Sequence, residues 1–232
     1  FAKHARQVAY YCDDQEITYE QLDKLSLKIA IYLQQLGLKV GDAVGVMLPN
    51  ILQYPVITLG VIRAGMVLVS MNPSYTSREL EHQMDDADIK ALFILDKFIY
   101  TYKDIADNLK RDLHHLIICR LGDLKGKLKG ALINLVSATT DLPPKGNWVY
   151  FSQLLAGASK AYQRPNLTLS NIVLIQYTGG TTGTAKGAML SHGNVIANLL
   201  QIDALIRSAY DEEGQEDIIL ASLPLYHVFS FT

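Results

Sequence analysis

Short, uninterrupted apolar segments recur along the first 120 residues, and stretches with helical spacing separate them. Residues 43–49 (AVGVMLP), 66–71 (MVLVSM) and 89–95 (IKALFIL) are of this kind. A strand with one face in water alternates apolar and polar residues, so these strands are expected to be buried on both faces. The sequence therefore predicts an α/β fold, with layered, mostly parallel sheets flanked by helices.

Two of the expected helices carry a capping signal. Thr18 is followed three residues later by Gln21, and Thr76 is followed by Glu79, which is the spacing of a capping box. Residues 19–36 continue the first signal, with leucine and isoleucine at three- and four-residue spacing. We therefore expect helices to begin directly after Thr18 and Thr76.

Composition excludes several classes of protein. The 232 residues are 49% hydrophobic and 19% charged, with a net charge of -2, so a globular core is expected and phosphate-driven nucleic-acid binding is not. Cys12 and Cys119 lie far apart and form no C-x-x-C pattern, which is typical of a reducing cytosol. No apolar stretch reaches the roughly 18 to 20 residues of a membrane span.

Residues 121–148 interrupt the alternation and contain an amphipathic helical pattern. The pattern favours a surface helix packed on the domain, and a basic segment that touches a membrane surface is the alternative. Apolar residues expected on one face are Leu124, Leu128, Leu132, Leu135 and Val136, with Lys125, Lys127 and Lys129 nearby.

A loop rich in glycine and threonine follows the apolar strand 171–178. Four glycines and four threonines occur between residues 178 and 187, with one lysine and no acidic residue. Lys186 is followed by Gly187, so a Walker A loop is excluded, and Thr178 stands where a dinucleotide fingerprint needs glycine. The short run 188–190 and the N-cap residue Ser191 indicate that the loop joins two strands.

Such a loop can bind a polyphosphate. Glycines let successive backbone N–H groups converge on an anion, and threonine hydroxyls can donate to phosphate oxygens. Lys186 adds a charge-assisted hydrogen bond. A plain hairpin would need only two to five residues, so a solvated turn explains the loop poorly.

These residues carry a family resemblance. The motif YTGGTTGTAKGAMLSH, at residues 177–192, resembles the phosphate-binding motif of the adenylate-forming superfamily, and LPLYHVFSFT, at residues 223–232, is similar to its downstream aromatic-histidine segment. Upstream, NPSYTSRELEHQ, at residues 72–83, resembles bacterial long-chain fatty-acid–CoA ligases in particular.

The resemblance implies two half-reactions. A carboxylate attacks the α-phosphate of Mg-ATP to give an acyl-adenylate and pyrophosphate, and the thiol of coenzyme A then forms the thioester. The implied partners are a fatty acid, ATP and coenzyme A, with Mg²⁺ as cofactor. Residues implied to clamp the β- and γ-phosphates are Thr178, Gly179, Gly180, Thr181, Thr182, Gly183 and Lys186.

Other roles follow from the same resemblance. Thr178 is the candidate contact to Mg²⁺, and a carboxylate from outside the chain is expected to share the ion. His227 is the candidate catalytic residue, placed near the substrate carboxylate and the α-phosphate. Tyr226 and Phe229 are expected in the pocket wall, and His192 at the start of a helix.

The resemblance covers the whole chain but only the first half or less of such an enzyme. Residues 1–168 would form a first α/β subdomain and residues 169–232 the start of a second. The adenine and ribose segments, a metal-binding glutamate and a C-terminal domain with a catalytic lysine would lie beyond Thr232, so the chain alone is expected to be inactive. A cytoplasmic location is implied, while a homodimer and contact with the inner face of the membrane stay open.

Two alternatives remain at this point. One is an adenylation domain or CoA ligase for an amino, aryl or shorter-chain acid, because most of the acyl pocket would lie outside these residues. The other is a nucleotide-binding module without catalysis.

Overall fold

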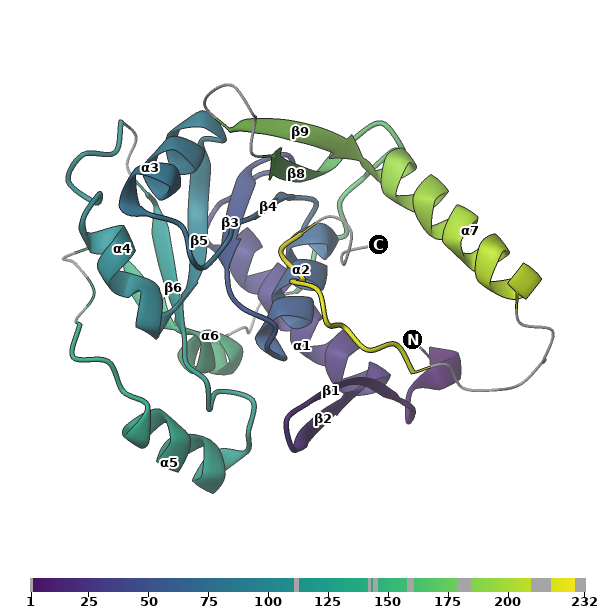
Figure 1. Cartoon of the computed structure of the whole chain (residues 1–232), viewed down its shortest axis with the longest axis horizontal. Coiled ribbons are helices and arrows are strands. Elements are labelled where there is room, and N and C mark those ends of the chain that lie inside the picture. The colour runs from purple at the N-terminus through teal and green to yellow at the C-terminus, as the bar shows by residue number, and fades with distance from the viewer. Residues whose placement is uncertain are drawn as a thin grey trace.

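The computed structural model describes residues 2–110, 113–141, 143, 146–157, 161–178, 185–209 and 218–227 (Figure 1). Within these ranges a seven-stranded sheet forms the centre of the fold, and all its strands run parallel except β9, which pairs antiparallel with β8. The predicted α/β class is confirmed. In spatial order the strands are β7 (Trp148–Tyr150), β6 (His115–Cys119), β5 (Ile89–Leu95), β3 (Ala43–Met47), β4 (Val67–Ser70), β8 (Ile172–Thr178) and β9 (Lys186–Ser191).

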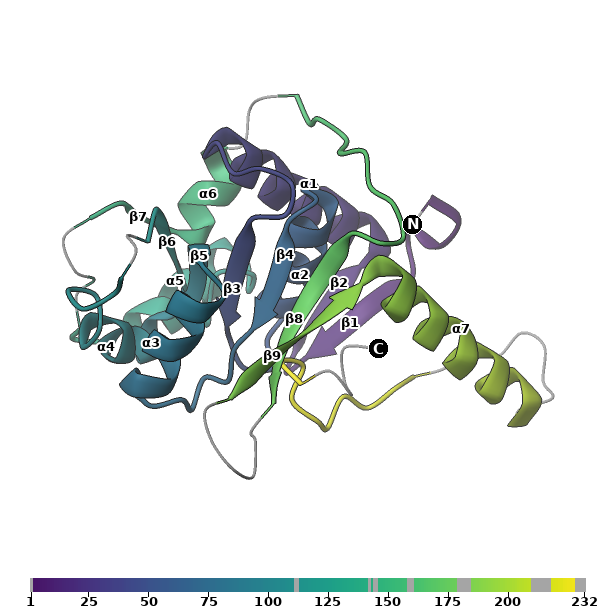
Figure 2. The same cartoon turned by 90° about the horizontal axis from the view of Figure 1, so that it is seen from above.

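Helices cover both faces of the sheet, as the apolar strands predicted (Figure 2). One face packs against α1 (Tyr19–Gln35), α2 (Gln53–Arg63) and α6 (Phe151–Gly157). The other face packs against α3 (Ser77–Asp86) and α4 (Ile99–Lys103).

The pleat of β3 shows how the two cores form. Val44 and Val46 point into the core beneath α1 and α2, whereas Ala43 and Met47 point into the core beneath α3 and α4. Because successive side chains of a strand face opposite sides, an apolar residue is needed at every position. All five residues of β3 are buried.

Local signals set the helix starts. The Thr18 side chain accepts from the Gln21 N–H at 3.3 Å, and the Thr18 N–H donates to Gln21 Oε1 at 2.8 Å. The Thr76 N–H likewise donates to Glu79 Oε2 at 2.8 Å. Both expected capping boxes are present, and each satisfies N–H groups that a helix start leaves unpaired.

The remaining elements lie outside the main sheet. β1 (Val8–Cys12) and β2 (Gln15–Thr18) form a separate antiparallel pair that leads into α1. Two further helices flank the body, α5 (Lys127–Val136) and α7 (His192–Ala209). Short 3-10 turns occur at Ala2–His4 and Asp96–Phe98.

The structure corrects one expectation about α5. The helix is present, and Leu124, which precedes it, packs against the core. The other four residues expected on the apolar face do not pack on the domain: Leu128 is 90% exposed and Val136 is 81% exposed. The one buried residue of α5 is Gly130. The physical reason is a close backbone contact on the opposite side of the helix, which is described below.

We predict that Gly60→Ala destabilises the fold. An added Cβ at Gly60 would lie 2.4 Å from Ile29 Cβ, and Ile29 is fully buried where α1 and α2 meet. Overpacking of this kind costs about 1–3 kcal/mol, so the urea midpoint should fall. Gly157→Ala is the matched control, because a Cβ there meets open space, and its midpoint should stay within error or rise slightly. Equal midpoints for the two variants would contradict the contact.

Candidate functional site

The ends of β8 and β9 frame the loop singled out by the sequence. Thr178 is the last residue of β8, Lys186 is the first of β9, and the two are paired in the antiparallel ladder. Both side chains are exposed. β8 runs parallel to β4, so Thr178 lies at the sheet edge where the parallel strands have their carboxyl ends. Ligands of open α/β sheets bind at this edge.

The hairpin is held by close packing behind the loop. A Cβ added at Gly187 would lie 2.7 Å from Ile175 Cγ2 and 3.1 Å from Tyr177 Cζ, so only glycine fits. The Tyr177 hydroxyl donates to Asp86 Oδ2 on α3 at 2.6 Å. Burial raises the pKa of Tyr177, and the Asp86 carboxylate raises it further, so the hydroxyl keeps its proton and remains a donor.

A second contact from α3 fixes the exit of the loop. His82 Nε2 lies 2.8 Å from the Ala185 carbonyl oxygen, which can only accept, so this nitrogen carries the proton. The His82 ring also packs edge-on to Tyr177, with centroids 6.1 Å apart. Sequence reasoning assigned no role to His82 or Asp86, and the structure identifies both as residues that position the hairpin.

The loop itself lies outside the described residues. The predicted phosphate contacts that fall there are Gly179, Gly180, Thr181, Thr182 and Gly183. Of the predicted clamp, the structure therefore places Thr178 and Lys186, at the two strand ends that the loop joins.

The predicted catalytic histidine lies on a segment tethered to the same sheet edge. Asn50, three residues after the end of β3, donates through Nδ2 to the carbonyl oxygens of Leu223 at 2.9 Å and Ala221 at 3.2 Å. Its Oδ1 accepts from the Leu225 N–H at 2.8 Å. Sequence reasoning missed Asn50, because its partners are more than 170 residues away.

The hydrogen bonds from Asn50 hold the aromatic-histidine segment so that Tyr226 faces the core and His227 faces solvent. Tyr226 is partly buried against the core beneath α1 and α2, whereas His227 is exposed and its N–H donates to the Pro224 carbonyl oxygen at 3.0 Å. Phe229 lies outside the described residues. One strand, β4, separates β3 from β8, so the ends of β3 and β8 lie about 10 Å apart, and the tether follows the end of β3. Figure 2 shows the C-terminal segment passing this edge.

Two cavities in the described residues lie at the opposite end of the strands, where the parallel strands begin. One, of about 430 Å³, is lined by Arg63, Tyr162, Arg164 and His192 among others. The second, of about 400 Å³, is lined by residues at the amino ends of the strands, including Gly41, Gly65 and Ile172. His192 begins α7, as expected, and burial lowers the pKa of its ring. These cavities do not coincide with the candidate phosphate site.

The described residues do not complete a metal site. Within the ranges of the chain that the structure covers, no three His, Cys, Asp or Glu side chains come close enough to hold an ion. The Thr178 hydroxyl is the one predicted ligand that the structure places, so its contact with Mg²⁺ stays a prediction. Among the same residues, no helix has both the length and the apolarity to cross a membrane.

Comparison with known proteins identifies the family of the chain. The family model described as AMP-binding enzyme matches residues 1–232. A long-chain-fatty-acid–CoA ligase of Escherichia coli O157:H7 is 42% identical over 237 residues, covering 100% of this chain and 42% of that protein. The chain thus spans about two fifths of the length of such relatives.

Solved structures show the same fold. The crystal structure of ATP-bound MatB from Rhodopseudomonas palustris superposes with a TM-score of 0.68 at 27% identity, covering 94% of this chain and 37% of MatB. The apo structure of Mycobacterium smegmatis MbtA gives a TM-score of 0.77 at 23% identity, covering 98% of this chain and 38% of MbtA. The resemblance expected from the glycine-threonine motif is confirmed, and the chain belongs to the AMP-binding enzyme family.

Proposed function

We propose that this chain is the N-terminal part of an AMP-forming long-chain fatty-acid–CoA ligase. One observation carries the proposal: the register of β8 and β9 sets Thr178 opposite Lys186, at the sheet edge where ligands of α/β folds bind. In this proposal the loop between them surrounds the β- and γ-phosphates of ATP with the backbone N–H groups and hydroxyls of residues 178–183. The ATP bound in the crystal structure of MatB, which has the same fold, supports ATP as the nucleotide.

The chain's own residues would act by charge and position. The Lys186 ammonium group offsets the negative charge that builds on the departing pyrophosphate, an interaction that gains strength as the bond to the α-phosphate breaks. A bound Mg²⁺ would supply further charge neutralisation, with the Thr178 hydroxyl among its ligands. The bonds from α3 to Tyr177 and Ala185 hold both strand ends in place before the nucleotide arrives.

His227 would serve the carboxylate substrate. The tether through Asn50 leaves its ring exposed beside the sheet edge, within the segment proposed to face the acid and the α-phosphate. Donation from the ring to a carboxylate oxygen would orient the acid for attack, and a charged ring would offset the developing charge.

A long-chain acyl group is the proposed substrate. It is supported by relatives named long-chain-fatty-acid–CoA ligase at about 40% identity.

We propose a division into two subdomains, residues 1–168 and 169–232, with the remaining site residues beyond Thr232. The enzyme would be cytoplasmic, with peripheral contact to the inner face of the membrane. Thioester formation by the full-length protein with fatty acids of graded length tests the proposed substrate. A preference for aryl or amino acids would instead favour a CoA ligase or adenylation domain for those acids.

We predict that Lys186→Ala in the full-length protein lowers the rate of ATP–pyrophosphate exchange by roughly tenfold to a hundredfold, the equivalent of ~1.5–3 kcal/mol for a hydrogen bond to a charged group. Because Lys186 is exposed, the melting temperature should not change. Lys39→Ala, at an exposed lysine before β3, should leave both quantities unchanged. Unaltered exchange in the Lys186 variant would remove the proposed role.

We predict that Asn50→Asp releases the histidine segment. The carboxylate cannot donate to the carbonyl oxygens of Ala221 and Leu223 and repels them instead, while keeping the size of the side chain. Amide hydrogen exchange of peptides covering residues 218–227 should become faster, and adenylate formation should fall. Asn147→Asp, at an exposed site, is the matched control. Unchanged exchange rates would show that Asn50 does not hold the segment.

We also predict that the purified 232-residue chain makes no acyl-CoA. In the proposal it holds the phosphate loop and His227 but neither the adenine site nor the catalytic lysine domain. Mass spectrometry of reactions with ATP, coenzyme A and palmitate should find no thioester, whereas the full-length protein should form it. A thioester from the short chain would overturn the proposed division of the site.

A further inference from the structure

We propose that α5 is a membrane-docking element, which lays its outward face on an anionic phospholipid surface. This deepens the peripheral membrane contact of the proposed function by naming the element that makes it. The observation is geometric: α5 turns four of its five large apolar side chains to solvent and packs against the protein through Gly130 and Asn134. Figure 1 shows α5 beneath the main sheet, at the opposite side of the molecule from α7.

The outward face of α5 is continuous and aliphatic. At about 100° per residue, four of its five large apolar side chains fall within one side of the helix, and the fifth, Ile133, is half-buried. The exposed fractions of these four are Leu128 90%, Leu132 61%, Leu135 75% and Val136 81%. A helix packed on a domain by its apolar stripe shows the reverse arrangement.

The inward face of α5 is fixed by backbone proximity. A Cβ added at Gly130 would lie 2.2 Å from the Gly122 carbonyl oxygen, so the helix and the preceding turn touch through their main chains. One turn further on, Asn134 Oδ1 accepts from the Gly122 N–H at 2.7 Å, and Asn134 Nδ2 donates to Asp123 Oδ1 at 3.2 Å. These contacts set the rotation of the helix about its axis.

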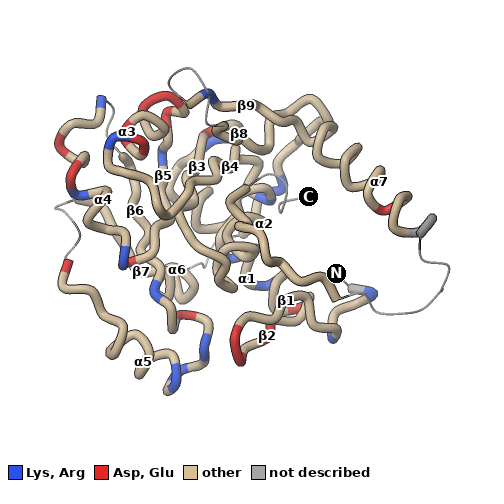
Figure 3. Tube along the Cα trace, viewed as in Figure 1, with Lys and Arg blue, Asp and Glu red and all other residues tan. Residues whose placement is uncertain are grey.

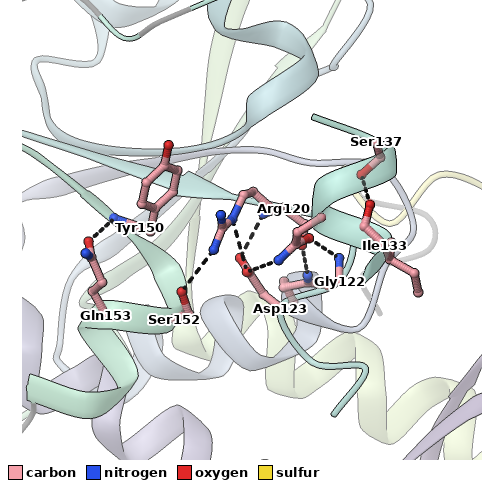
Figure 4. A network of polar contacts seen from close by, with 10 residues as sticks. Arg120, Gly122, Asp123, Ile133, Ser137, Tyr150, Ser152 and Gln153 are labelled. Carbon is pink, nitrogen blue, oxygen red and sulfur yellow. Dashed lines mark hydrogen bonds and ion pairs between the residues drawn. The ribbon is translucent and has the colours of Figure 1, made fainter. Parts of the chain in front are cut away.

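A polar network at the carboxyl end of β6 supports this seat (Figure 4). Asp123 Oδ2 accepts from the Arg120 N–H at 2.8 Å, and the Arg120 guanidinium stacks 4.3 Å from the centre of the Tyr150 ring. The Asp123 side chain is fully buried. The contacts of α5 with the turn at Gly122 and Asp123 are therefore specific, and the exposure of the leucines does not come from a loosely attached helix.

Lysines border the apolar face. On a helical projection, Lys127 and Lys129 lie about 100° to either side of Leu128. Lysines so placed can keep their ammonium groups among lipid headgroups while the leucines enter the acyl layer. Gly126 is the N-cap residue of α5 and makes no side-chain cap. The uncapped N–H groups of the first helical turn add positive potential near the lysines. Figure 3 shows this cluster of basic residues.

Nearby acidic residues reduce part of that charge. Lys125 Nζ lies 2.6 Å from Asp13 Oδ2, and Lys129 pairs with Asp14, both on the turn between β1 and β2. No ion pair joins Lys127 to any of the described residues. The apolar face is thus expected to supply most of the affinity, and Lys127 a smaller, salt-sensitive share.

The chemistry of the face favours a bilayer over a protein partner. Protein interfaces are enriched in aromatic residues and bury about 800 Å² per partner. The α5 face is purely aliphatic, and ten helical residues span only about 15 Å. Leucines with flanking lysines, by contrast, are typical of helices that lie in the membrane interface.

Flotation of the full-length protein with vesicles tests the proposal. Wild type is expected to float with vesicles of phosphatidylcholine and phosphatidylglycerol. The triple variant Leu128→Gln/Leu132→Gln/Leu135→Gln should lower the partition coefficient by about tenfold or more. The matched triple Leu→Met variant stays apolar and should bind as wild type does. Should the triple glutamine variant fold poorly, Leu128→Gln alone is to be used, since that side chain is the most exposed.

A charge variant separates the electrostatic part. Lys127→Gln should weaken binding to these vesicles by about fivefold, the equivalent of ~1 kcal/mol per lysine at an anionic surface. Binding to vesicles of phosphatidylcholine alone should not change, and Lys39→Gln should change neither.

The failure of this inference is distinct from failure of the proposed function. Thioester synthesis from an acid in solution, without vesicles, should be the same in wild type and triple glutamine variant. Wild type that does not float, or a triple glutamine variant that floats equally well, overturns the docking role whatever the activity. A wild-type dimer in light scattering that the triple glutamine variant turns into a monomer would show that α5 binds a second copy, and would also overturn it.

Discussion

Strand β8 hydrogen-bonds to β4 in parallel, with Leu68 opposite Leu174 and Ser70 opposite Gln176. This pairing brings a strand that begins at residue 172 beside one that ends at residue 70, and both have their carboxyl ends at the same sheet edge. The positions of Thr178 and Lys186 depend on it. Thr178 and Lys186 lie at this edge because β8 ends there, and the Asn50 tether is near them because β3 ends there too.

The antiparallel turn back into β9 gives the loop two fixed ends, and α3 holds both. Tyr177, next to the outgoing end, bonds to Asp86, and Ala185, next to the returning end, bonds to His82. The chain loses less conformational entropy when an anion binds between strand ends that are already held in place. Part of this entropy has already been lost on folding. The buried phenol and glycine-only contact behind the loop therefore bear on binding as well as on stability.

The sequence predicted those features that depend on neighbouring residues. Apolar runs located β3, β4 and β5, and the threonine caps located the starts of α1 and α3, because strand burial and capping are read over a few residues. It did not predict β7, which is only three residues long, nor the contacts of Asn50 and His82, whose partners lie more than 100 residues away. The phosphate motif was recognisable because its glycines and threonines are contiguous, whereas the residues that position it are not.

For α5, the sequence pattern predicted the helix but not which face packs on the protein. Its periodicity predicted a helix correctly, yet periodicity cannot say which face turns inward. That choice follows from Gly130: leucine in its place could not approach the Gly122 carbonyl, so the side of the helix with the smallest residue must face the turn. The leucines then have to face outward, at a cost of ~1.5–3 kcal/mol each relative to burial. A helix needed only to cover the surface would meet no such cost with polar residues at those four positions, so the leucines are best explained by an apolar environment outside the chain.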